Sequence, residues 1–146
     1  DGNNRCSLWI NAAIQFDFNL QIATPVGYEP NAALVAEAGK RLSVSNDPIA
    51  AATGADLVTT DVFASMGQEA EQEERLKHFA GFQVNHALMA HAADNALFMH
   101  CLPAHRDEEV SGELLEDETI SVVWDEAENR LHAQKALMVF LLGASS

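Results

Sequence analysis

The sequence predicts an α/β protein in which a parallel sheet is covered by helices on both faces. Short apolar segments, each as long as a buried strand, alternate along the chain with segments of helical periodicity. Three of the apolar segments also end one or two residues before a polar or reactive side chain, namely Asp61, Cys101 or Asp125. Ligands of open parallel sheets bind just beyond the carboxyl ends of the strands. We therefore expect the functional residues to gather at that edge of the sheet.

The elements of the first half follow from turn residues and apolar periodicity. Pro25 closes the first strand and Gly39 stops the second helix, while Asp47 is placed to cap the third helix. The turn residues 1–4 lead straight into a helix, so we expect the chain to be a fragment that begins at a strand-to-helix junction. In chain order the expected elements are a helix over 7–16, a strand over 20–23, a helix over 30–35, a strand over 41–44 and a helix over 48–52.

The second half repeats the alternation. Its first helix carries Glu71 and Arg75 at a spacing that places both on one solvated face. The expected elements are a strand over 57–60, a helix over 69–79, a helix over 85–92, a strand over 96–99, a loop through 108–109, a strand over 120–124 and a helix over 125–142. The apolar run 137–142 is more continuous than a helix with one solvent face requires, so we expect part of it to be exposed.

Composition limits the classes of function. A length of 146 residues suits one domain, and a net charge of -14 argues against nucleic acid as a partner. No glycine-rich phosphate loop is present, and no apolar run approaches the roughly 20 residues of a membrane span. The two cysteines are far apart and suggest a reducing compartment, hence a cytoplasmic location.

The candidate site residues also have ordinary structural explanations. Cys101 is either a buried core cysteine or a functional thiol at a strand end, and Asp61 either caps a turn or binds a ligand. Arg130 could simply pair with a glutamate one helical turn away. Zinc held by His100, Cys101 and His105 is disfavoured, because no carboxylate or second cysteine pair stands at ligand spacing. His86 and His91 are expected at the surface.

Four motifs together resemble the ornithine carbamoyltransferase family. They are Asp-Gly-Asn-Asn at 1–4, Asp-Val-Phe-Ala-Ser-Met-Gly-Gln-Glu at 61–69, His-Cys-Leu-Pro at 100–103 and Glu-Ala-Glu-Asn-Arg at 126–130. The resemblance covers nearly the whole chain. It implies a Rossmann-like single domain over 1–146, the ornithine-binding domain of a two-domain transcarbamoylase whose carbamoyl-phosphate-binding domain is absent from this chain.

The resemblance implies a set of contacts with the amino acid. In the family pattern, Asn4 binds the carboxylate end of ornithine, while Asp61, Ser65 and Met66 hold its α-amino and carboxylate groups. A carboxylate opposite an ammonium is a chemically sensible pairing.

The resemblance also implies the residues that act on the reacting groups. Cys101 would lie near the attacking side-chain amine, the Leu102 carbonyl would orient that amine, and Arg130 would face the carbamoyl oxygen. A thiolate or carboxylate near the amine could accept its proton, and Arg130 would stabilise charge on the attacked carbonyl. Cys101 and Arg130 are thus the catalytic candidates.

The reaction implied is carbamoyl phosphate plus L-ornithine giving L-citrulline and phosphate, without metal or organic cofactor, in a homotrimer that binds neither nucleic acid nor membranes. Biosynthetic and citrulline-degrading directions both remain open. A second hypothesis is a non-catalytic amino-acid-binding or assembly domain derived from a truncated transcarbamoylase. The complete set of Asp61, Ser65, Cys101 and Arg130 favours the transferase.

Overall fold

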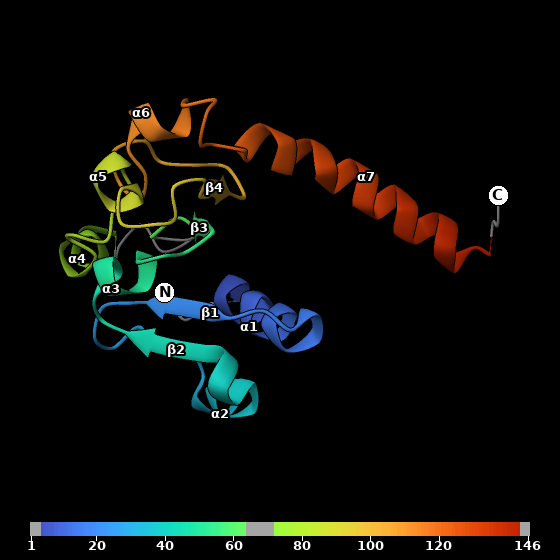
Figure 1. Ribbon diagram of the computed structural model, residues 1–146, viewed down its shortest axis with the longest axis horizontal. Helices are drawn as coiled ribbons and strands as arrows, with labels where there is room; N and C mark the ends of the chain where they lie inside the picture. Colours follow the sequence, from blue (N-terminus) through green and yellow to red (C-terminus); the bar gives the residue numbers. More distant parts are fainter. Residues whose placement is uncertain (1–3, 64–71, 144–146) are drawn as a thin grey trace.

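The fold is known from a computed structural model, which describes residues 4–63 and 72–143 (Figure 1). Helices and short strands alternate along the described chain. In order they are α1 (Asn4–Phe16), β1 (Leu20–Ala23), α2 (Ala32–Ala38), the 3-10 helix η1 (Gly39–Arg41), β2 (Leu42–Ser45), α3 (Pro48–Ala52), β3 (Leu57–Thr60), α4 (Gln72–His78), α5 (His86–Met89), β4 (Leu97–His100), α6 (Gly112–Leu115) and α7 (Val123–Leu141).

The α/β prediction is confirmed, and the strand pairing is parallel. β1 pairs with β2 and β3 pairs with β4, so the described strands form two parallel pairs rather than one continuous sheet. Residues 20–23, 48–52 and 57–60 form the elements expected over those ranges. Asn31 and Asp47 cap the amino ends of α2 and α3 by accepting backbone N–H bonds, which fixes where these helices begin.

The prediction of a strand over 120–124 is wrong. The segment makes only an isolated bridge, in which Phe98 donates its N–H to Ile120 and accepts from the N–H of Val122 at 2.9 and 3.0 Å. The chain then turns into α7, which begins at Val123, two residues before the expected start. Acidic residues Asp125 and Glu126 in the first turn favour a helix there, because they complement the positive end of its dipole. The short helix α6 within the expected loop was not predicted either.

The main core surrounds β4. Phe98, Val110, Leu114 and Val123 are fully buried and belong to one cluster. This packing holds the strand whose carboxyl end carries His100 and Cys101.

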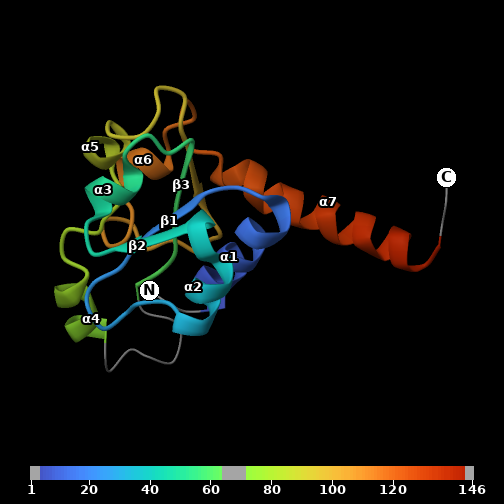
Figure 2. The same cartoon turned by 60° about the horizontal axis from the view of Figure 1, so that its bottom comes forward.

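The long helix α7 packs against β4 only near its start and then extends away from the rest of the chain (Figures 1 and 2). Its apolar run is exposed, as expected: Phe140 and Leu141 are 80% and 71% accessible. Within the described residues, no helix combines the length and apolar content needed to cross a membrane.

The facing edges of the two strand pairs line a cavity of about 620 Å³. Every residue of β1 and of β3 lines it, and so do Trp9 and Arg5 of α1 and the residue that follows β3, Asp61. The cavity therefore runs along both strands and reaches the edge at which the candidate site lies.

Candidate functional site

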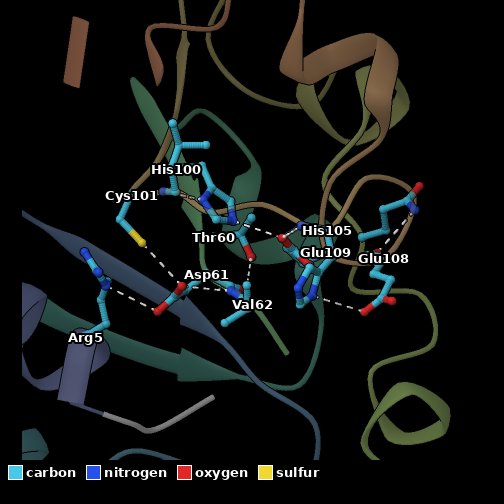
Figure 3. A network of polar contacts seen from close by, with 11 residues as sticks. Arg5, Thr60, Asp61, Val62, His100, Cys101, His105, Glu108 and Glu109 are labelled. Atoms are coloured by element: carbon cyan, nitrogen blue, oxygen red, sulfur yellow. Dashed lines mark hydrogen bonds and ion pairs between the residues drawn. The ribbon is translucent and has the colours of Figure 1, made fainter. Parts of the chain in front are cut away.

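Asp61 and Cys101 lie side by side because of the register between β3 and β4. Thr60 pairs with His100 as the last residues of the two strands, so the next residue of each chain segment emerges at the same edge. The Cys101 thiol donates a hydrogen bond to Asp61 Oδ1 at 3.3 Å (Figure 3). Two residues 40 positions apart in sequence thus form one polar centre.

The Asp61 carboxylate is fixed on both sides. Its Oδ1 also accepts the backbone N–H of Val62 at 2.8 Å, and its Oδ2 lies 3.3 Å from Nε of Arg5. Arg5 comes from the first turn of α1 and points toward Asp61 (Figure 3). Sequence reasoning missed Arg5; the only signal was a cation next to the Asn-Asn motif at the start of a helix.

A buried histidine–glutamate pair lies directly behind this centre. His100 and Glu109 are both fully buried, and His100 Nε2 lies 3.1 Å from Glu109 Oε1. His100 Nδ1 accepts the backbone N–H of Leu102 at 2.9 Å, so this ring nitrogen carries no proton and Nε2 is the donor to Glu109. The tautomer of His100 follows from its two partners.

This pair fixes the turn that follows β4. Leu102 has a left-handed φ of 53°, which a leucine rarely adopts. The same oxygen of Glu109 also accepts the N–H of His105 at 2.7 Å, so Glu109 holds both ends of the turn. The pair therefore positions the Cys101 thiol and the Leu102 backbone. The buried role of Glu109 was not predicted, because this residue was expected in a loop.

Burial and the nearby carboxylate keep Cys101 in its thiol form. Desolvation, then the charge of Asp61 and the hydrogen bond to it, raise the pKa of Cys101 to about 11, while Arg5 acts in the opposite direction. At neutral pH Cys101 is a hydrogen-bond donor rather than a thiolate.

The reactivity of Cys101 gives a direct check. In a Cys6→Ser background, we expect the rate of alkylation by iodoacetamide to be low at neutral pH and to rise with pH up to about 11, because only the thiolate reacts. Asp61→Asn should move the midpoint of this profile to lower pH, since it removes a charge that opposes ionisation. The alkylation rate is measured at each pH from samples quenched at successive times. A midpoint near that of a free cysteine in the parent protein would contradict the geometry.

The other predicted residues are not all joined to this centre. Arg130 is exposed on α7, and within the described residues no hydrogen bond or ion pair joins it to Asp61 or Cys101. Glu126, one turn earlier on the same helix, is near enough to Cys101 to raise its pKa. Ser65 and Met66 lie outside the described residues, and Asn4 is the first residue of α1.

The histidines and acids suggest one group that could share a metal ion. Among the residues that the structure describes, ligand atoms of His105, Glu108 and Glu109 lie within 4.8 Å of one another. The set of His100, Cys101 and His105 is unsuitable, because both ring nitrogens of His100 are already hydrogen-bonded. His86 is at the surface, as expected, where it pairs with Asp117.

Comparison with known proteins identifies the family. The model of the family described as "Aspartate/ornithine carbamoyltransferase, Asp/Orn binding domain" matches residues 1–141. An ornithine carbamoyltransferase of Chromohalobacter salexigens is 63% identical over 142 residues, which are 97% of this chain and 46% of that relative. One of Methylococcus capsulatus is 64% identical over 144 residues, 99% of this chain and 48% of the relative. The chain thus spans about half the length of the curated relatives it matches.

Solved structures agree with this assignment. Ornithine carbamoyltransferase from Pyrococcus furiosus matches 100% of this chain and 49% of its own, with 46% identity and a TM-score of 0.88. Acetylornithine transcarbamylase complexed with acetylcitrulline matches 93% of this chain and 43% of its own, with 27% identity and a TM-score of 0.77. The fold, the site at the strand ends and these matches lead to one conclusion: this chain belongs to the aspartate/ornithine carbamoyltransferase family and corresponds to its Asp/Orn binding domain.

Proposed function

We propose that residues 1–146 form the ornithine-binding domain of an ornithine carbamoyltransferase. The enzyme transfers the carbamoyl group of carbamoyl phosphate to the side-chain amine of L-ornithine and releases L-citrulline and phosphate. The observation that carries this proposal is the Asp61–Cys101 centre at the ends of β3 and β4, found in a chain whose curated relatives bear this enzyme's name.

In the proposed complex, Asp61 receives the α-ammonium of ornithine, with Asn4, Ser65 and Met66 completing the α-amino and carboxylate contacts. An anionic carboxylate opposite an ammonium forms a charge-assisted hydrogen bond, stronger than one between neutral groups. The position of Asp61 supports this role, since its side chain lines the cavity and is only partly exposed.

The reacting amine lies near Cys101 and the Leu102 carbonyl. The neutral amine attacks the carbamoyl carbon, the bond from that carbon to the phosphate oxygen breaks, and phosphate leaves with the bonding electron pair. The proton lost by the amine passes to a nearby base. Arg130 stabilises the negative charge that develops on the carbonyl oxygen, an interaction made in the transition state rather than with the substrate.

The complete enzyme is proposed to be a cytoplasmic homotrimer that requires neither metal nor organic cofactor. The exposed apolar end of α7 supports further packing partners in the complete protein, because such a surface is costly in water.

The activity has a simple test. A complete carbamoyltransferase that contains this chain, supplied with the half found in its relatives, should convert L-ornithine and carbamoyl phosphate to citrulline in a colorimetric assay. L-Aspartate offered in place of ornithine should give no carbamoyl-aspartate. Turnover of aspartate, or of neither amino acid by a folded protein, would contradict the proposed function.

A further inference from the structure

Tyr28 joins the segment that follows β1 to the helix α4. Its ring and that of Phe79 meet edge to face with centroids 4.9 Å apart, and the guanidinium of Arg75 lies over the Tyr28 ring at 5.1 Å. The Tyr28 hydroxyl lies 3.0 Å from Nδ1 of His78. Aromatic pairs in this geometry and cations over a ring face are both favourable contacts. One half-buried side chain thus holds α4 and the residue after it through its ring and its hydroxyl.

The same part of α4 holds the chain where it leaves β3. Phe63, two residues after Asp61, is buried and stacks on Phe79 with ring centroids 4.6 Å apart. The carbonyl oxygen of Phe63 accepts a hydrogen bond from Nη1 of Arg75 at 3.2 Å. The side chain and the backbone of Phe63 are therefore both fixed by residues that Tyr28 contacts.

Tyr28 and Phe63 belong to opposite sides of the cavity, which β1 and β3 line. Tyr28 follows β1, and α1 belongs to the same side because it packs against β1 and α2. Phe63 follows β3, which pairs with β4. Within the described residues no ladder hydrogen bonds join the two sides, so side-chain contacts such as those of Tyr28 set how far apart the sides stand at the carboxyl edge.

This separation matters for the proposed function, on which the inference rests, because the amino-acid end of ornithine is then bound from both sides. Asn4 lies on α1, whereas Asp61 follows β3. A misplacement of about 1 Å caused far from the reacting groups can cost on the order of a hundredfold. We propose that Tyr28 is a positioning residue, which sets the distance between Asn4 and Asp61 and so the affinity for ornithine.

The experiment uses a complete carbamoyltransferase that contains this chain. Tyr28→Leu keeps an apolar side chain but removes the ring and the hydroxyl, whereas Tyr28→Phe keeps the ring. Phe18→Leu is the matched control, because Phe18 is also half-buried and pairs with Trp9 of α1 at 6.2 Å, within one side of the cavity. The measurements are kcat and KM for L-ornithine at saturating carbamoyl phosphate, the midpoint of urea unfolding, and the pH profile of Cys101 alkylation without substrates. Mass spectrometry of the peptide that contains Cys101 reads this alkylation.

We expect Tyr28→Leu to raise the KM for ornithine roughly threefold to thirtyfold, as for loss of one aromatic pair and one cation–π contact, with kcat changed less than about threefold. Cys101 should be alkylated at lower pH in this variant, as in Asp61→Asn, because a displaced Asp61 no longer opposes ionisation of the thiol. Tyr28→Phe should keep the KM within about twofold of the parent, since the ring contacts remain. Phe18→Leu should lower the urea midpoint and leave the other two measurements unchanged.

A KM or an alkylation profile of Tyr28→Leu that stayed at the parent value would overturn the proposal, because Tyr28 would then only add stability. An equal rise of the KM in Phe18→Leu would also overturn it, since any loosening beside the cavity would then suffice. If Tyr28→Leu did not fold, Tyr28 would be a core residue and the proposal would be rejected. A parent enzyme without ornithine turnover would instead reject the proposed function, whereas the alkylation profile would still show whether Tyr28 holds Asp61 in place.

Discussion

Replacing Glu109 by alanine should lower the free energy of unfolding by about 3–5 kcal/mol, because it removes one partner of a fully buried polar pair. His100 would lose its acceptor at Nε2, and the N–H of His105 would lose the same oxygen. Urea denaturation of the chain, followed by circular dichroism, measures the change as a lower midpoint with an unchanged slope.

Two variants show whether burial causes this effect. Glu109→Gln keeps an acceptor for both donors, so it should cost less than half as much as alanine. Glu116→Ala removes the partner of Arg106 in an exposed ion pair and should cost no more than about 1 kcal/mol. If Glu109→Ala lowered the free energy of unfolding no more than Glu116→Ala does, the His100–Glu109 pair would not support the turn after β4.

Asp61→Asn should weaken the binding of ornithine by roughly tenfold to a hundredfold, about 1.5–3 kcal/mol, because it removes the charge opposite the α-ammonium. In the complete carbamoyltransferase, the substitution should mainly raise the KM for ornithine. This KM is measured with ornithine varied at saturating carbamoyl phosphate. Some loss of kcat is also expected, since Asp61 accepts the hydrogen bond of the Cys101 thiol, and the reacting amine lies near that thiol in the proposed complex.

Asp56→Asn is the matched control for this change. Asp56 precedes β3, so it lines the same cavity but at the opposite end of the strand from Asp61. The same loss of one negative charge there should leave the KM for ornithine within about twofold of the parent. Parallel effects of the two substitutions would mean that the cavity responds to net charge alone, and Asp61 would lose its assigned role.

The sequence was a good guide wherever local rules govern the chain. Alternating apolar segments gave the α/β class, and the strand ends placed Asp61 and Cys101 at one edge. The register Thr60 to His100 then brings them into contact. The prediction of a strand over 120–124 was wrong because this apolar segment makes only a short bridge to Phe98 and then continues into α7. The apolar character of a run this short does not distinguish a strand from the start of a helix.

The two polar contacts that the sequence did not reveal both join distant segments. Arg5 meets Asp61 across 56 positions of sequence. Glu109 is an acid inside the core, and its burial depends on His100 and on the turn at Leu102. Residue type and spacing describe neighbours along one helix or strand. They do not show which charge a tertiary contact will neutralise.

The cavity between the strand pairs has a consequence for what the fold can accept. Within the described residues β1 pairs only with β2, and β3 only with β4, so each has a second edge whose N–H and C=O groups lack a ladder partner. Backbone donors and acceptors therefore line the cavity along both strands, beside the side chains that line it.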